Sequence, residues 1–390
     1  MTQPSDRLVA PAGAAQAQAQ RAGDDGRLTF DDEGVTRGGW TRAAGVRLGA
    51  LPLLALTLVV SVVLAAAIGA VPIAPATSAA VLLNATHLFH LPRTWSVADE
   101  AILLQLRLPR VVGAALVGAA LATAGTLFQG LLRNPLADPF LLGTSAGAAL
   151  GASVAFVVPA LFVVSWLGFS LIAILAFAGA LGSAALVYTI ATRQHRTPVV
   201  TLLLSGVAVG AVLTAAQTLV IALQEHSGLR ILGLYYWLAG SVDVQNWAQI
   251  GVLLPLVAFA IVCGVLLAPA LDAFALGEEM AEHLGLPVER VKLLVVALAA
   301  LLVGAAVSIS GLVGFVGLVA PHVCRITLGP RHRLLLPASA LVGAIFVVLA
   351  DLLARTLVAP SELPLGVITA LVGGPFFLYL LRSAGQAYRW

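Results

Sequence analysis

Three polar stretches follow one another closely in an otherwise apolar sequence: Arg107-Leu-Pro-Arg110, Arg133-Asn-Pro-Leu-Ala-Asp-Pro139 and Gly143-Thr-Ser-Ala-Gly147. They place charges, prolines and glycines at the ends of two apolar segments, each long enough to cross a membrane. A polar, helix-breaking segment at membrane depth is tolerated only where it lines a cavity or is buried in protein. The stretches therefore predict a membrane protein whose polar loops meet a passing ligand or a partner.

The composition supports a membrane protein. The chain has 390 residues, of which 60% are hydrophobic and only 10% charged, whereas about a quarter of the residues of a soluble domain are charged. The net charge of +3 is too small to indicate a nucleic-acid partner. Cys263 and Cys324 both lie in apolar runs and are expected to be buried thiols. We therefore expect an all-α protein embedded in the lipid bilayer.

Hydropathy predicts about ten transmembrane helices, of which the eighth is the shortest. The polar residues 1–46 lack an apolar core typical of a signal peptide and are predicted to be a disordered cytoplasmic tail. A less apolar stretch, 72–106, separates the first two spans, and the aromatic segment 224–246 predicts a short interfacial helix. The ten apolar runs are 47–71, 111–132, 140–164, 166–192, 198–223, 247–270, 293–309, 311–324, 334–358 and 365–381.

An even number of spans puts both termini on one side of the membrane. Lys and Arg are concentrated in cytoplasmic segments, and a cytoplasmic N-terminus puts about twice as many of them inside as outside. This bias predicts cytoplasmic termini. Arg107, Arg110 and Arg355 would then lie near the outer surface, against the bias.

These three arginines leave two interpretations open. Asp351 precedes Arg355 by four residues and could pair with it along a helix. The arginines could capture carboxylates of an external protein, or they could extend toward the interface and pack.

A charged loop, residues 272–288, lies between the sixth and seventh spans. Gly277 and Gly285 can break the chain at either end of a short amphipathic helix. Such a helix would lie along the cytoplasmic face, either as a docking helix for a soluble partner or as an ordinary connector. Its residues include Gly277, Glu278, Glu279, Ala281, Glu282, His283, Leu284 and Gly285.

No catalytic, metal or cofactor site is predicted. His87 and His90 could supply two metal ligands, but no Cys or carboxylate nearby in the sequence completes a set. The chain has no Gly-x-x-x-x-Gly-Lys phosphate-binding pattern, so we expect ATP hydrolysis to reside in a separate subunit. An ion-driven carrier would place several carboxylates near mid-membrane, and Asp351 is the main candidate.

Seven motifs then resemble, in order and spacing, the permease family of bacterial type II ABC importers, which take up iron–siderophore complexes, haem and cobalamin. The resemblance covers roughly residues 47–385. Its motifs are Arg107–Arg110, Gln129–Pro139, Leu142–Gly147, Leu276–Gly285, Gly314–His322, Leu349–Arg355 and Glu362–Gly366.

The resemblance implies an inverted-repeat fold of about ten helices, working as a homodimer with two ATP-binding cassette subunits and a periplasmic substrate-binding protein. A weak internal echo, Val111–Gly125 against Val291–Gly311, agrees with such a repeat. By resemblance, the 272–288 loop is the segment that couples to the ATPase. Arg107, Arg110 and Arg355 would dock the binding protein, and the cytoplasmic gate would comprise Asn134, Leu136, Arg196 and Thr197.

The predicted function is therefore the permease subunit of an ATP-driven importer of a ferric siderophore or haem, in the cytoplasmic (inner) membrane. A cobalamin permease, an ion-coupled secondary carrier and a membrane scaffold without transport are the alternatives. A carrier would work without ATP or partners. The sequence does not distinguish among the cargoes.

Overall fold

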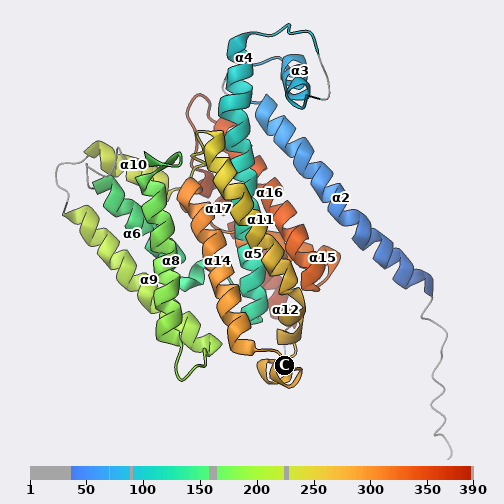
Figure 1. Cartoon of the computed structure of the whole chain (residues 1–390), viewed down its shortest axis with the longest axis vertical. Helices are drawn as coiled ribbons and strands as arrows, with labels where there is room; N and C mark the ends of the chain where they lie inside the picture. Colours follow the sequence, from blue (N-terminus) through green and yellow to red (C-terminus); the bar gives the residue numbers. More distant parts are fainter. Residues whose placement is uncertain (1–36, 70, 88–90, 158–164, 224–227, 388–390) are drawn as a thin grey trace, which may run out of the picture. The chain divides into compact units, whose positions relative to one another are not determined.

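The computed structural model describes residues 37–69, 71–87, 91–157, 165–223 and 228–387, and these residues are almost entirely helical (Figure 1). The chain divides into a unit of residues 1–48 and a unit of residues 49–390, and the helical bundle belongs to the second. The helices are α2 (Arg37–Ala67), α3 (Pro75–Ala85), α4 (Val97–Ala101), α5 (Leu108–Leu132), α6 (Thr144–Val157), α8 (Leu171–Ala191), α9 (Val199–Ala222), α10 (Gly228–Leu238), α11 (Trp247–Leu266), α12 (Ala268–Phe274), α13 (Glu278–His283), α14 (Val288–Ser310), α15 (Val316–Leu328), α16 (His332–Thr356) and α17 (Leu365–Ala387).

Four smaller elements complete the described chain. A π-helix, η1 (Ile102–Arg107), joins α4 to α5, and a 3-10 helix, η2 (Pro139–Leu142), precedes α6. The two-residue strands β1 (Ser165–Trp166) and β2 (Phe169–Ser170) pair antiparallel before α8. Helix α10 lies within the segment predicted to hold a short interfacial helix.

The described chain contains ten apolar helices, which confirms the predicted architecture. Seven are long and apolar enough to cross a membrane, and three, Thr144–Val157, Val316–Leu328 and Leu365–Leu380, are shorter. About 20 residues are needed to span the hydrocarbon core at 1.5 Å per residue, so the 14 residues of α6 fall short of a full crossing.

The second long helix begins earlier than its hydropathy predicts, because α4, η1 and α5 form one continuous segment from Val97 to Leu132. Ser96 caps its start by accepting a hydrogen bond from the N–H of Asp99 at 3.0 Å, which satisfies one of the free donors of a first turn. The Leu108 N–H bonds to the Leu103 carbonyl, five residues back. This wider turn lies just before Pro109, which has no N–H to offer the helix.

Helix α5 lies at the centre of the bundle, packed against α14, α15 and α16. In the segment Val97–Leu132, which ends with α5, 83% of an apolar 18-residue stretch is buried, against 22% for α9 and 17% for the part of α2 that begins at Gly49. Glycines allow the closest contacts: a Cβ on Gly118 would lie 2.1 Å from the Gly343 carbonyl oxygen, and one on Gly125 would lie 1.8 Å from that of Gly317. Small residues thus let the helix backbones touch.

Candidate functional site

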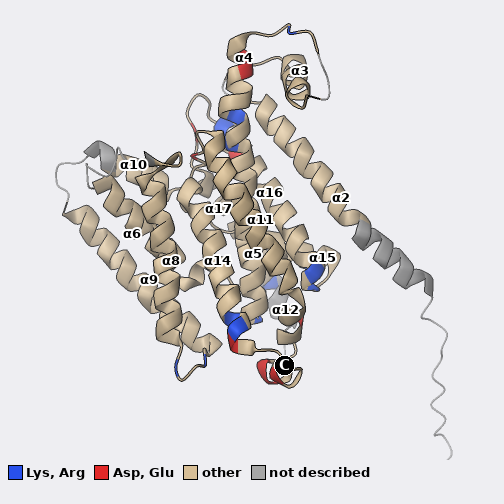
Figure 2. Ribbon diagram, viewed as in Figure 1, with Lys and Arg blue, Asp and Glu red and all other residues tan. Residues whose placement is uncertain are grey.

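Charged residues gather toward the two ends of the bundle, while the middles of the helices carry almost none (Figure 2). We call the group Arg107, Arg110, Asp351, Arg355 and Glu362 the arginine cluster, and the group Thr197, Glu278, Glu289 and Lys292 the lysine cluster. The two clusters lie at opposite ends of α14. Lys292 lies near its start, and near its other end the Ile309 carbonyl accepts a hydrogen bond from the Asp243 N–H. Asp243 lies beside the start of α5, which carries Arg110 of the arginine cluster.

Arg110 forms the centre of the arginine cluster. Its guanidinium donates to one carboxylate oxygen of Asp351 at 3.2 and 3.0 Å and to both oxygens of Glu362 at 3.0 and 2.8 Å. Asp351 is buried and also accepts from Arg355 Nε at 2.8 Å, so the intrahelical pair expected from the four-residue spacing is confirmed. Asp351 thus bridges two guanidinium groups that come from different helices.

Arg107 and Arg355 cap the C-terminal end of α2 with side-chain hydrogen bonds. Arg107 donates to the carbonyls of Ala66, at 3.3 Å, and Ala67, at 3.0 Å, and also to that of Val71. Arg355 donates to the Ala65 carbonyl at 3.1 Å. The last carbonyls of a helix have no partner within it and carry partial negative charge, so buried cations stabilise this end.

The three arginines predicted to dock an external protein therefore differ in exposure. Arg107 and Arg355 are buried, and all their described polar contacts lie inside the chain. The Arg110 side chain is 21% exposed and its partner Glu362 is 49% exposed. Of the three, only Arg110 could reach another protein without rearrangement of this end of the bundle.

Helix α13 forms where the sequence predicts a short helix, and Gly285 terminates it. Gly285 has a positive φ of +82°, its N–H bonds to the Glu282 carbonyl, and the Leu286 N–H bonds to the Ala281 carbonyl. This pair of bonds is the Schellman arrangement, which favours glycine at the left-handed position. Gly277, with φ of +110°, is the N-cap that precedes the helix.

One face of α13 and its flanks exposes an apolar row. Leu276, Met280 and Leu284 are four residues apart and are 69%, 48% and 62% exposed, whereas Ala281 is fully buried against the bundle. Acidic residues, Glu279 and Glu282, border the row and are also exposed. An apolar row with an acidic border, outside the membrane-length helices, has the character of a protein-binding surface.

The four residues predicted as a gate fall into two separate places. Asn134 and Leu136 form a tight turn after α5, in which the Asn134 side chain accepts from the Leu136 N–H at 2.9 Å. Arg196 and Thr197 lie in the hairpin between α8 and α9, where Arg196 is exposed and Thr197 is buried. Within the described ranges, no hydrogen bond or ion pair joins the two pairs.

Asn134 lines a cavity of about 500 Å³ between the end of α5, α12 and the connection from α15 to α16. Three arginines, Arg133, Arg325 and Arg331, also line it, with the pair formed by His332 Nδ1 and Asp272 at 2.7 Å. The predicted Asn134 turn is therefore bordered by cations.

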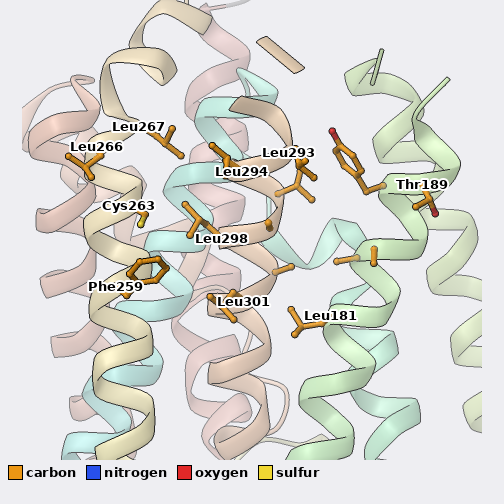
Figure 3. A pocket seen from close by; sticks show the side chains of 16 residues that line it. Leu181, Thr189, Phe259, Cys263, Leu266, Leu267, Leu293, Leu294, Leu298 and Leu301 are labelled. Carbon is orange, nitrogen blue, oxygen red and sulfur yellow. The ribbon is translucent and has the colours of Figure 1, made fainter. Parts of the chain in front are cut away.

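A second cavity, of about 830 Å³, lies between α8, α11 and α14 (Figure 3). Its walls are leucines, alanines and Phe259, with the polar atoms of Tyr188, Thr189 and Cys263 the few exceptions. Of the side chains that the structure describes, no charged one lines it, so it fits hydrocarbon rather than an ionic ligand.

In the part of the chain that the structure describes, no three His, Cys, Asp or Glu side chains are grouped as metal ligands would be. His87 is described, but His90 lies outside the described residues.

Sequence reasoning missed two residues that hold the Thr197 hairpin. The Glu289 carboxylate accepts from the Thr197 N–H at 2.9 Å, and Lys292 Nζ donates to the Thr197 carbonyl at 3.0 Å. The sequence did contain a signal for these two residues. Lys292 lies one turn inside an apolar helix and Glu289 precedes it by three residues, a spacing that places both side chains on one helix face.

Several proteins to which this chain is similar are permeases of import or transport systems. The FecCD transport family matches residues 57–383. The chain is 44% identical over 284 residues to the cobalamin import system permease protein BtuC of Halobacterium salinarum, covering 73% of this chain and 74% of that protein. It is 43% identical to the hemin transport system permease protein HmuU of Yersinia pestis, covering 72% and 83%.

A ferric-citrate relative and a solved structure match over more of the chain. The Fe(3+)-citrate import system permease protein YfmE of Bacillus subtilis is 39% identical, and the match covers 88% of this chain and 97% of that protein. A structure of a metal-chelate type ABC transporter in an inward-facing conformation superposes with a TM-score of 0.72 at 29% identity, covering 85% of this chain and 98% of the other.

Proposed function

Because the chain belongs to the FecCD transport family, we propose that it is the permease subunit of an ATP-driven ABC importer that carries an iron chelate across the cytoplasmic membrane. The observation that carries the proposal is the family match over residues 57–383, which includes both charged clusters. The ten apolar helices supply the membrane-spanning body that such a subunit needs.

A ferric chelate or haem is the cargo that the relatives favour. Permeases for ferric citrate, ferric hydroxamate and hemin are among them, and cobalamin permeases are also similar, so a cobalamin importer is the second candidate. The chain acts as a transport subunit rather than an enzyme, and ATP hydrolysis occurs in partner subunits.

The ATPase subunits dock on α13. The exposed row of Leu276, Met280 and Leu284 supports this assignment, since burying it against a partner would remove apolar surface from water. Glu279 and Glu282 at its border offer charges for steering and orientation. The α13 end of the bundle then faces the cytoplasm, and both termini do as well.

The binding protein docks at the opposite end, with Arg110 as the contact residue. Its partial exposure and its pairing with the half-exposed Glu362 support this role, because a partner carboxylate could replace that of Glu362. Arg107 and Arg355 act indirectly by holding α2 against the bundle, through their bonds to its last carbonyls.

Transport proceeds by alternating access between two copies of this chain, with the pathway at their interface. Asn134 and Leu136, together with Arg196 and Thr197, form the cytoplasmic gate. ATP binding draws the ATPase subunits together and moves α13. The glycine contacts of α5 with α15 and α16 let the central helices slide as packed bodies.

The ion-coupled carrier is less well supported. A carboxylate that binds and releases a coupling ion must be free to do so. Asp351 is instead fixed between Arg110 and Arg355 at 3.0 and 2.8 Å.

Reconstitution in liposomes with the cognate ATPase and binding protein tests the function. We expect uptake of one of ferric citrate, hemin or cobalamin that requires ATP and both partners. Uptake without ATP or partners, abolished by Asp351→Asn, would instead establish the secondary carrier. Absence of any ATPase complex would refute the importer.

A further inference from the structure

We propose that Lys292 is a positioning residue that carries the movement of α13 to the hairpin between α8 and α9, and so links the ATPase-binding helix to the cytoplasmic gate. The inference rests on the proposed function, since it requires an ATPase that acts on α13. It adds a named connection between two segments that lie far apart in the sequence.

Lys292 joins three segments through one ammonium group. Its Nζ donates to Glu278 of α13 at 2.6 Å, to Glu289 of its own helix at 3.0 Å and to the Thr197 carbonyl at 3.0 Å. An ammonium has three N–H donors, so each is used once. The side chain is only 4% exposed, and water therefore competes little for these bonds.

Thr197 ties the hairpin to α14. Thr197 is buried, and both its N–H and its carbonyl bond to α14 side chains, those of Glu289 and Lys292. Arg193 and Arg196 exchange backbone hydrogen bonds of 2.9 and 3.0 Å, which close the turn. A displacement of the Lys292 ammonium would therefore displace the hairpin as one piece, together with the start of α9.

Helix α13 is suited to move as a unit. Gly277 and Gly285 flank it with positive φ angles, and glycine allows a wide range of backbone conformations at such joints. Among the described residues, the pair of Glu278 with Lys292 is the only ion pair that joins α13 to another helix. Force applied to α13 thus has a direct polar route to α14 and Thr197.

A purely structural role does not explain why a lysine, rather than an apolar residue, occupies position 292. Glu278 and Glu289 are each about a third exposed, so water could solvate both carboxylates without a lysine. Burying an ammonium costs free energy that an apolar side chain of similar length would not. The connection of α13 to Thr197 is what Lys292 provides and an apolar residue would not.

The test uses the full-length permease assembled with its cognate ATPase subunits in lipid nanodiscs. Spin labels at Arg193→Cys, in the hairpin, and Arg333→Cys, on α16, report the hairpin position in a background lacking Cys263 and Cys324. The distance between the labels is measured with and without ATP and vanadate. Co-purification of the ATPase and its hydrolysis rate show whether α13 is engaged.

We expect the nucleotide-dependent change in this distance in the parent protein, and its loss in Lys292→Met although the ATPase still binds. Lys292→Arg keeps a cation with several donors and should preserve the change. Arg290→Met, which removes an exposed cation from the same helix, is the matched control and should also preserve it.

A full distance change in Lys292→Met would overturn the inference while leaving the proposed function intact. Failure of the parent protein to bind the ATPase would overturn both. Should Lys292→Met fail to assemble, Glu278→Gln decides, because Glu278 is partly exposed and its loss threatens folding less. We expect a reduced distance change there, and an unchanged one would refute the link.

Discussion

The arginine cluster and the lysine cluster are built in contrasting ways at the two ends of one bundle. In the arginine cluster, Asp351 lies buried between Arg110 and Arg355, and each of these groups belongs to a membrane-length helix. In the lysine cluster, the buried charge is the single cation Lys292, and its partners Glu278 and Thr197 belong to a short helix and a hairpin.

The contrast indicates different tasks for the two ends. Buried ion pairs between long, packed helices fix those helices relative to one another, because separating the partners leaves an uncompensated charge. A buried cation that holds two short segments transmits displacement between them. One segment, α13, lies between Gly277 and Gly285, and the other turns at Gln194 and His195, all four with positive φ angles. One end is thus suited to resist movement, and the other to convey it.

The largest effect is expected from Asp351→Ala. It leaves Arg110 and Arg355 without their shared buried partner, which typically costs about 3–5 kcal/mol. The midpoint of thermal unfolding in detergent should fall sharply. Glu362→Ala is the control: Glu362 is half-exposed, and the loss of an exposed pair costs about 1 kcal/mol or less. Equal effects of the two changes would refute the buried character of this cluster.

A smaller loss of stability is expected from Lys292→Met. Hydrogen bonds to charged groups contribute about 1.5–3 kcal/mol, but here the two carboxylates left behind are partly exposed and can turn to water. The same unfolding measurement should give a decrease well below that of Asp351→Ala. A decrease as large as that of Asp351→Ala would mean that the lysine cluster also fixes the fold, and the contrast between the ends would fail.

Local features of both ends could be predicted from the sequence. The pair of Asp351 and Arg355 follows from a spacing of four residues on a helix, and α13 follows from apolar residues between Gly277 and Gly285. These patterns depend on neighbours along one helix, which periodicity describes directly.

The remaining contacts join residues that are distant in the sequence. Arg110 meets Asp351 across 241 positions, and Lys292 meets Thr197 across 95. These contacts depend on which helices pack against each other. Helices rich in Ala, Leu and Gly have similar hydropathy, so the sequence does not predict which pairs of helices are in contact. The early start at Val97 was missed for a related reason: polar residues such as Asp99 and Glu100 suggest a loop, yet they lie favourably in the first turn of a capped helix.

Gly285→Ala should have a modest effect that isolates the backbone geometry of α13. The φ of +82° is strained for any residue with a Cβ, but nothing lies within 4 Å of where that Cβ would be. The expected cost is therefore backbone strain alone, about 1–2 kcal/mol. Gly251→Ala is the control, because Gly251 also has open space and lies in α11 without a positive φ. It should be neutral or slightly stabilising, and a comparable loss there would contradict the conformational explanation.

The smallest effect on stability, and a large one on assembly, is expected from Met280→Glu. Met280 is half-exposed and belongs to the apolar row of α13, so its replacement should change the free energy of unfolding by about 0.5 kcal/mol or less. The same change puts a charge where an ATPase would bury apolar surface, and a buried unpaired charge is costly. Co-purification of the ATPase subunits should therefore be lost from a permease that unfolds normally.

Met280→Leu, which conserves the apolar surface, should restore it. Normal ATPase binding by Met280→Glu would show that the exposed row does not form the docking surface, and the end that conveys movement would then have to be engaged elsewhere.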